Sequence, residues 1–217
     1  MQFGYIGINY KDAKIKIRNK VSFTDNQKID FLQKVGKSGI DQCMILSTCN
    51  RSELFFFFRE EKQLEDLRSL YAARVPEIKN ASYLKISFGV EAMEYLFRIA
   101  AGLESLVLGE DQILGQVKEA QEFSRTLGYG GKEINRVVRD AVTCAKKIKS
   151  RFKISENPLS VSSIGIRQVD QIYGIKGKQV LVIGSGSMAV LAIRYLYEYK
   201  AGKVTVCSRT LAHAKEL

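Results

Sequence analysis

The sequence has no tryptophan, a single histidine and only two prolines among its 217 residues. Its four cysteines form no CxxC pair, and with His213 as the lone histidine we expect no zinc site. The longest strongly apolar run, Leu54–Phe58, is far shorter than a membrane span, and the N-terminus lacks the pattern of a secretory signal. We therefore expect a soluble, cytoplasmic protein without a disulfide framework.

Ordinary amounts of the remaining residues indicate a globular protein. Hydrophobic residues make up 46% and charged residues 26%, which excludes collagen-like, low-complexity and largely disordered classes. The 17 glycines and few prolines make long flexible linkers improbable. The length fits one large domain or two small ones.

Positive charge is in excess, since 34 Lys and Arg face 23 Asp and Glu. Residues 132–153 hold eight basic side chains against two acidic ones, and residues 11–20 hold five against one. Such patches on folded segments suit contacts with the phosphates of a nucleic acid. The alternative is a basic surface that only keeps the protein soluble.

The hydrophobic pattern predicts an α+β domain with a hairpin-like or split βαβ arrangement in roughly the first 150 residues. Thr24 or Asp25 is a plausible N-cap, and Asn157-Pro158 interrupts the helical pattern before a βαβ unit. The expected strands are 2–9, 43–47, 54–58, 83–87, 178–183 and 203–207, and the expected helices are 24–37, 60–74, 89–102, 110–127, 131–151, 160–173 and 188–200.

A glycine-rich turn, Gly184-x-Gly186-x-x-Ala189, follows the predicted strand 178–183 and precedes a predicted helix. This is the dinucleotide-binding fingerprint in its required context. The first glycine allows the tight turn, and the second lets the backbone approach a pyrophosphate at the helix N-terminus. The turn predicts a dinucleotide cofactor.

The end of the following strand indicates which cofactor. NAD enzymes usually carry an acid there, but this sequence has Ser208, Arg209 and Thr210. Arg209 can pair with a 2′-phosphate and the two hydroxyls can donate to it, which favours NADP(H) over NAD(H). Alternatively, Arg209 is a solvated charge next to a helix.

Cys49 is the most informative cysteine, because it lies in the polar segment Thr48-Cys49-Asn50-Arg51 between two predicted strands. A neighbouring guanidinium favours the thiolate, which is the nucleophile, and Thr48 and Asn50 could donate to an acyl oxygen. The alternative is a buried structural thiol. That alternative suits the other three cysteines better, namely Cys43, Cys144 and Cys207.

Polar groups also crowd into the otherwise apolar, glycine-punctuated stretch 102–119. Such a cluster suits recognition of a small polar ligand, including an α-ammonium group. Alternatively, Glu110 and Asp111 cap a helix. The polar residues are Glu104, Ser105, Glu110, Asp111, Gln112 and Gln116.

These segments together closely resemble one family, glutamyl-tRNA reductase. The resemblance rests on Ser47-Thr48-Cys49-Asn50-Arg51, on the long run from Leu96 to Ala120, on the Gly184 turn, and on Gly7-Ile8-Asn9-Tyr10-Lys11 with Arg18. It covers essentially the whole chain in the right order.

The resemblance implies NADPH-dependent reduction of glutamyl-tRNA(Glu) to glutamate-1-semialdehyde, the first step of five-carbon tetrapyrrole (porphyrin, haem) synthesis. Cys49 would attack the aminoacyl ester and form a glutamyl thioester. The implied substrate-binding residues are Thr48, Asn50, Arg51, Tyr95, Ser105, Glu110 and Gln112, although the role of Asn50 is less clear. The implied NADPH-binding residues are Gly184, Ser185, Gly186, Ser187, Met188, Ala189, Ser208, Arg209 and Thr210.

The family's architecture implies a catalytic domain at 1–153, with a ferredoxin- or RRM-like βαβ core plus helices. An incomplete α/β Rossmann-type domain would follow at 154–217, and the C-terminal dimerisation domain would be absent. The family also implies a homodimer in its full-length form and glutamate-1-semialdehyde aminomutase as a partner.

The sequence departs from the family at several positions. Tyr95 stands where a histidine is usual, as does Tyr10, and a tyrosine is a poor base near neutral pH. Ser187, Ala189 and Ser208 are conservative changes in the nucleotide-binding region. Two other hypotheses therefore stay open: an impaired relative that binds tRNA or a partner without turnover, and an NADP dehydrogenase fused to an RNA-binding domain.

Overall fold

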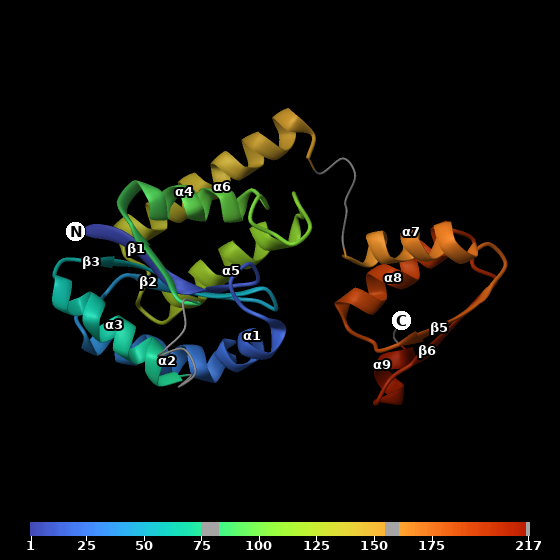
Figure 1. The fold of residues 1–217 in the computed structure, drawn as a ribbon, viewed down its shortest axis with the longest axis horizontal. Helices are drawn as coiled ribbons and strands as arrows, with labels where there is room; N and C mark the ends of the chain where they lie inside the picture. Colours follow the sequence, from blue (N-terminus) through green and yellow to red (C-terminus); the bar gives the residue numbers. More distant parts are fainter. Residues whose placement is uncertain (75–82, 155–160, 216–217) are drawn as a thin grey trace. The chain divides into compact units, whose positions relative to one another are not determined.

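The computed structural model describes residues 1–74, 83–154 and 161–215, so Asn157 and Pro158 lie outside the described residues. The chain divides into two compact units, Met1–Ile154 and Ser155–Leu217 (Figure 1). None of the helices in the described part combines the length and hydropathy that crossing a bilayer requires.

A four-stranded sheet forms the middle of the first unit, with the strand order β2-β3-β1-β4 and every neighbouring pair antiparallel. Its strands are β1 (Gln2–Asn9), β2 (Cys43–Ser47), β3 (Arg51–Phe58) and β4 (Lys85–Phe88). Strand β3 is buried along its whole length. Its alternate side chains supply two different cores, one on each face of the sheet.

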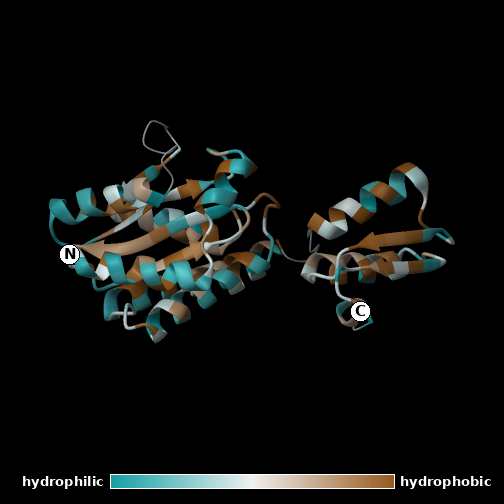
Figure 2. Ribbon diagram, turned by 90° about the horizontal axis from the view of Figure 1, so that it is seen from below, coloured by the Kyte–Doolittle hydropathy of each residue, from teal (hydrophilic) through white to brown (hydrophobic). Residues whose placement is uncertain are grey.

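Two layers of helices cover the two faces of this sheet (Figure 1). The core under one face includes side chains from α2 (Asp25–Lys37) and α3 (Glu61–Arg74), and the short α1 (Ile15–Val21) lies beside them. The core under the other face includes side chains from α4 (Gly89–Ala100), α5 (Gln112–Thr126) and α6 (Lys132–Phe152). Figure 2 shows the hydrophilic sides of these helices turned outward.

Local sequence signals explain several helix boundaries. Thr24 caps α2 in a full capping box with Gln27, as the sequence predicted. The backbone amides of Glu133 and Ile134 at the start of α6 donate to the buried side-chain oxygen of Gln42, each at 3.1 Å. The basic segment after β1 is not among the predicted helices and strands, but part of it forms α1, because Val21 can be buried against the sheet.

The second unit contains α7 (Val161–Tyr173), β5 (Gln179–Ile183), α8 (Ser187–Glu198), β6 (Lys203–Cys207) and α9 (Leu211–Lys215). Strands β5 and β6 pair in parallel, so the predicted βαβ unit is confirmed. Cys207 was expected to be a buried strand cysteine, but it is exposed because alternate residues of β6 face solvent.

Candidate functional site

Cys49 is exposed at the tip of the turn that joins β2 to β3. The turn is closed by the Thr48 amide, which donates to the Arg51 carbonyl at 2.8 Å. The Asn50 amide donates to Thr48 Oγ1 at 3.1 Å, so the threonine side chain shapes the turn around the thiol. Cys49 is therefore presented to solvent on a backbone with defined hydrogen bonds.

Arg18 of α1 reaches the same turn from outside the sheet. Its Nε donates to the Cys49 carbonyl at 3.1 Å, and its Nη1 donates to the Ala13 carbonyl at 2.7 Å. A guanidinium is thus fixed next to the backbone of the exposed cysteine. The sequence resemblance pointed to Arg18 without giving it a role.

Arg51 occupies a different position from the one its sequence context suggested. It was expected in the polar turn, but it begins β3 and is only 2% exposed. Its Nη2 donates to the Glu104 carbonyl, and its Nη1 lies 3.4 Å from Glu53 Oε2 and 3.5 Å from the Tyr95 hydroxyl. The side chain is therefore held by neighbours on β3, on α4 and in the loop after α4.

Glu53 is the acidic partner of this network and is fully buried. The Tyr95 hydroxyl donates to Glu53 Oε1 at 2.5 Å and accepts from Asn9 Nδ2 at 3.1 Å. Gly7 lies opposite Glu53 in the sheet, and a Cβ at Gly7 would come within 2.6 Å of the Glu53 Cα. Glycine at this position therefore makes room for the buried carboxylate.

The charges of this network shift one another's ionisation. Burial raises the pKa of the Glu53 carboxyl, while Arg51 and the Tyr95 hydrogen bond act in the opposite direction. Burial is the largest influence on the Arg51 cation and lowers its pKa, but the charge and hydrogen bond of Glu53, together with Tyr95 and Glu104, outweigh burial, so the pKa of Arg51 is raised. The pKa of Tyr95 is raised by burial and by Glu53, so the phenol stays protonated as a hydrogen-bond donor.

Glu104 holds a second set of charges at the edge of this network. Its carboxylate accepts from Lys11 Nζ and from Arg98 Nε, the latter at 2.8 Å. Burial opposes ionisation, but the two hydrogen bonds outweigh it and lower the pKa of Glu104. The side chains of Lys11 and Arg98 are about half exposed, so their positive charges border the solvent.

The residues after Glu104 form a tight loop that leads to α5. Gly102 and Gly109 both adopt positive φ, and a Cβ at Gly102 would lie 3.0 Å from backbone atoms of Gly109 and Glu110. The buried Nζ of Lys149 on α6 donates to the carbonyls of Gly109 and Glu110 at 2.9 and 2.7 Å. It also donates to Asp111 Oδ1 at 2.8 Å, which fixes the loop to α6.

The predicted substrate-binding residues are thus brought together only in part. Thr48 and Asn50 lie in the Cys49 turn, whereas Arg51 follows it as the first residue of β3 and contacts Tyr95. Ser105 adjoins Glu104 and is 7% exposed, and its Oγ has no hydrogen-bond partner among the described residues. Gln112 is exposed at the start of α5, and no described contact joins Gln112 or the half-buried Glu110 to Cys49.

Sequence reasoning missed two buried charged residues that hold this region, namely Glu53 and Lys149. Two signals could have found them. Glu53 interrupts the alternation that puts Phe55 and Phe57 on one face of β3. Lys149 continues the helical spacing of the apolar stripe of α6, so its position predicts burial.

The glycine-rich turn of the second unit fits a dinucleotide. Gly184 has φ of +118°, a region that favours glycine, and open space surrounds the position of a Cβ at Gly184 and at Gly186. Gly186 is the N-cap of α8 and supplies no side-chain cap, so the first amides of the helix can serve an anion.

The two strand ends of this unit are joined next to the glycine-rich turn. The Gly184 amide donates to the Cys207 carbonyl at 2.7 Å, and the hydroxyls of Ser185 and Ser208 lie 2.8 Å apart. Arg209 and Thr210 are exposed directly after Ser208. Within the described ranges, no three His, Cys, Asp or Glu side chains gather as a metal site would need.

Comparisons with known proteins give a separate family match in each of the two units. The family described as "Glutamyl-tRNAGlu reductase, N-terminal domain" matches residues 6–152, and the family "Shikimate / quinate 5-dehydrogenase" matches residues 167–217. The second match supports a Rossmann-type region and a nicotinamide cofactor.

Individual relatives cover the whole chain. It is 38% identical over 219 residues to the glutamyl-tRNA reductase of Clostridium novyi (strain NT), covering 100% of this chain and 53% of the relative. It is 38% identical over 222 residues to that of Geobacillus thermodenitrificans (strain NG80-2), covering 100% and 49%. The chain thus spans about half the length of these relatives.

The same similarity holds among solved structures. The glutamyl-tRNA reductase from Methanopyrus kandleri matches with a TM-score of 0.68 and 29% sequence identity, covering 99% of this chain and 51% of that one.

Proposed function

The chain belongs to the glutamyl-tRNA reductase family, and from that premise we propose that it provides the catalytic part of an NADPH-dependent reductase. The substrate would be glutamyl-tRNA(Glu) and the product glutamate-1-semialdehyde, at the start of tetrapyrrole synthesis. The observation that carries this proposal is the exposed Cys49 on a hydrogen-bonded turn whose Cys49 carbonyl accepts from the Arg18 guanidinium. An exposed thiol in an electropositive turn has the surroundings of a nucleophile.

Cys49 would act first on the ester that joins glutamate to tRNA. The thiolate sulfur attacks the ester carbonyl carbon, an S–C bond forms, and the C–O bond to the terminal ribose breaks. The proton from the thiol ends on the ribose hydroxyl of the departing tRNA. NADPH, when bound, would supply the hydride that reduces the thioester to the aldehyde and releases Cys49 as the thiolate.

The neighbours of Cys49 would orient the glutamyl group. Thr48 shapes the turn, and Asn50 is the polar side chain next to the thiol. Ser105 brings a buried hydroxyl without a partner, which a substrate group could satisfy. Glu110 and Gln112 would complete the amino-acid site from the loop that Lys149 holds.

Arg51 and Tyr95 would act mainly by position. The Arg51 guanidinium already bonds Glu53, Tyr95 and the Glu104 carbonyl, so it fixes the loop that leads to Ser105. Tyr95 remains a protonated donor to Glu53, so it would not replace a histidine as a base. The family histidine therefore has no equivalent proton acceptor at this position.

The second unit would bind NADPH through its glycine-rich turn. The main-chain amides of Ser187 and Met188 would face the pyrophosphate, with Gly184 and Gly186 giving close approach, while the Ala189 amide donates to the Gly186 carbonyl at 2.8 Å. Ser185 and Ser208 hold the strand ends together, and Arg209 and Thr210 would bind the 2′-phosphate.

Further properties are proposed by family likeness. The strand order β2-β3-β1-β4 supports a ferredoxin-like core, because one or two helices cross over between β1 and β2 and between β3 and β4. We also propose a homodimer in the full-length protein, a cytoplasmic location, and handover of the aldehyde to glutamate-1-semialdehyde aminomutase.

A turnover assay tests the proposal. The full-length protein is mixed with glutamyl-tRNA and NADPH, and NADPH oxidation is followed beside the Cys49→Ser variant and a Cys144→Ser control. We expect turnover in the wild type and the control, and none in Cys49→Ser. Unchanged turnover in Cys49→Ser would show that Cys49 is not the nucleophile. Absence of turnover in the wild type would refute the proposed reductase activity.

A further inference from the structure

Helix α1 is fastened directly beside the Cys49 turn. Arg18 Nε donates to the Cys49 carbonyl at 3.1 Å, and Ser52 Oγ of β3 donates to the Val21 carbonyl at 2.8 Å. The Phe23 amide, just after the helix, donates to Ser47 Oγ of β2 at 3.0 Å. Three hydrogen bonds thus fix α1 and its C-terminal extension to the two strands that carry the cysteine turn.

The outward side of α1 is basic and contains no acid. Lys14 and Lys16 are exposed, and Arg18 is half buried against the turn. The one acid in residues 11–20 is Asp12, which lies 3.4 Å from Lys85 of β4. The positive charge beside Cys49 is therefore not neutralised within α1.

The placement of these lysines is unfavourable for the helix itself. Lys14 is the N-cap and Lys16 lies in the first turn, where the positive end of the helix dipole repels a cation. Lys14 and Arg18 are like charges four residues apart, which destabilises a helix. A partner with negative charge would relieve both repulsions.

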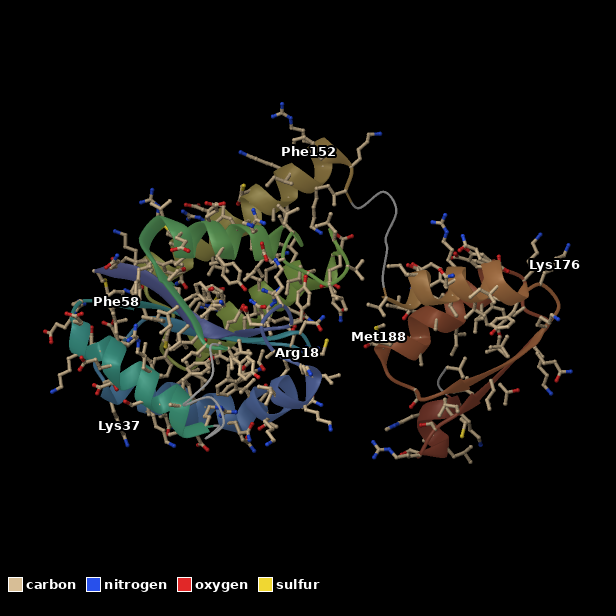
Figure 3. All side chains as sticks on the ribbon, viewed as in Figure 1. Arg18, Lys37, Phe58, Phe152, Lys176 and Met188 are labelled. Atoms are coloured by element: carbon tan, nitrogen blue, oxygen red, sulfur yellow. The ribbon has the colours of Figure 1, made fainter. Side chains whose placement is uncertain are left out.

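The other basic segment, α6, differs from α1 in its position and in the contacts of its charged side chains. Its side chains belong to the core on the opposite face of the sheet from α1. Figure 3 shows Arg18 of α1 well apart from Phe152, the last residue of α6. Its charges also have intramolecular roles. Arg136 and Arg139 lie 3.8 and 3.5 Å from Asp140, and Lys149 binds the Gly109 loop.

We infer that α1 is the surface that contacts the phosphates at the aminoacyl end of tRNA and guides the ester to Cys49. This inference rests on the proposed function, and the chemistry of the substrate supports it. The ester lies on the terminal ribose, so the last phosphates must lie within a few nucleotides of the nucleophile. Cations that contact them must flank Cys49, which is the position of α1 and not of α6.

Two matched double variants test the assignment, K14Q/K16Q on α1 and K146Q/K147Q on α6. Each removes two exposed lysines, and thermal unfolding checks that the fold is kept. Binding of uncharged tRNA(Glu) is measured over a range of salt concentrations. Each lost phosphate contact on a single strand lowers the slope of log K against log [salt] by about 0.7.

We expect the slope to fall by roughly 1.4 in the α1 variant and to stay unchanged in the α6 variant. The wild type bound to tRNA trimmed of its 3′-terminal nucleotides should give the same reduced slope, and the α1 variant should reduce it no further. An unchanged slope in the α1 variant, or an equal fall in both variants, would overturn the inference.

The two proposals fail separately. If the wild type binds tRNA with the expected slopes but does not oxidise NADPH with glutamyl-tRNA, the reductase proposal fails and the α1 surface stands. If turnover occurs and depends on Cys49 but the α1 variant binds tRNA like the wild type, the assignment of α1 as the phosphate-binding surface fails and the reductase proposal is kept.

Discussion

Cys49 and Arg51 are two residues apart, yet their surroundings are opposite. Cys49 is exposed at the turn, whereas Arg51 is buried and bonded to Glu53, Tyr95 and the Glu104 carbonyl. Removing one partner of a buried ion pair usually costs about 3–5 kcal/mol, because the other charge stays uncompensated. The arginine therefore stabilises the site and leaves the chemistry to the thiol.

Tyr95→Phe tests the role of the phenol. We expect the free energy of unfolding to fall by about 1–3 kcal/mol, because Glu53 loses a buried donor while the ring keeps its stacking with Tyr5. The pH profile of turnover should keep its shape near neutrality, because a phenol with a raised pKa is not the base. Urea unfolding and a pH–rate series measure the two effects.

A change in the shape of the pH profile in Tyr95→Phe would contradict this role, because it would make Tyr95 a proton-transfer group. Tyr5→Phe is the matched control, since the Tyr5 ring stacks on the Tyr95 ring at a centroid distance of 4.4 Å. It should leave both the hydrogen bonds of Tyr95 and the pH profile in place.

The sequence located the exposed residues of the site better than the buried ones. The polar context of Cys49 predicted a turn with an accessible thiol, and the turn is there. Arg51 was assigned to the same turn because of its polar neighbours in the sequence. Its burial depends on an ion pair with Glu53 of the same strand and on a hydrogen bond to the Glu104 carbonyl beyond α4. Such pairing depends on strand register and tertiary contacts.

At the scale of elements, the loop between α4 and α5 is positioned from α6. Lys149 is the single side chain that binds the carbonyls of Gly109 and Glu110 and the carboxylate of Asp111 among the described residues. Its burial leaves those carbonyls without water as a substitute partner. The loop should therefore loosen when this lysine is lost.

Lys149→Met should lower the free energy of unfolding by about 2–3 kcal/mol and speed amide exchange in residues 102–111. Lys146→Met on the same helix is exposed and should change stability by less than about 0.5 kcal/mol. Urea unfolding and hydrogen exchange measure both. Equal exchange in the two variants would show that the loop does not depend on Lys149.

Glu104 gives this region a dependence on pH. Its pKa is lowered in the folded protein from an ordinary 4.5 by Lys11 and Arg98 against burial, so its stabilising effect is present above that value. The effect is lost as the pH falls through the lowered pKa. The stability difference between wild type and Glu104→Gln should therefore shrink on acidification below about pH 4.5.

Urea unfolding between neutral and acid pH measures this difference. Glu122→Gln is the control, since Glu122 pairs with Arg125 on the exposed side of α5 and should contribute little. A difference between wild type and Glu104→Gln that stays constant on acidification would contradict the assignment.

Periodicity predicted most elements of the chain, because hydrophobic spacing reflects the same burial that forms them. The helix α2 after Thr24 and the βαβ unit around Gly184 are examples. It missed α1, whose seven residues carry three basic and three apolar side chains, too few apolar ones to show a helical period. The helix is held by hydrogen bonds to β2 and β3, which the local pattern does not contain.

At the scale of the whole molecule, the net charge of +11 includes two basic segments that lie on opposite faces of the sheet of the first unit, and the second unit carries the nucleotide turn. The charge alone indicated a polyanion as partner. The structure distinguishes the two basic segments, because α1 touches the Cys49 turn and α6 does not contact it in the described residues.

Arg209→Asp tests the cofactor preference of the second unit. We expect affinity for NADPH to fall about tenfold or more, because a charge-assisted pair with the 2′-phosphate becomes a repulsion. Affinity for NADH should change little, since NADH lacks that phosphate. Fluorescence titration measures both, with the exposed Arg167 of α7 as the site of a control Arg167→Asp variant. An equal loss of affinity for NADPH and NADH would show that Arg209 does not bind the 2′-phosphate.

Transfer of glutamate from tRNA to Cys49 is the central step, and it can be measured without the hydride step. The protein is mixed with glutamyl-tRNA labelled in the glutamyl group, without NADPH, and the protein is examined for bound label and by mass spectrometry after digestion. We expect a hydroxylamine-sensitive glutamyl adduct on the peptide that contains Cys49, and none in Cys49→Ser. An adduct on another residue, or release of labelled aldehyde by Cys49→Ser when NADPH is added, would contradict the account.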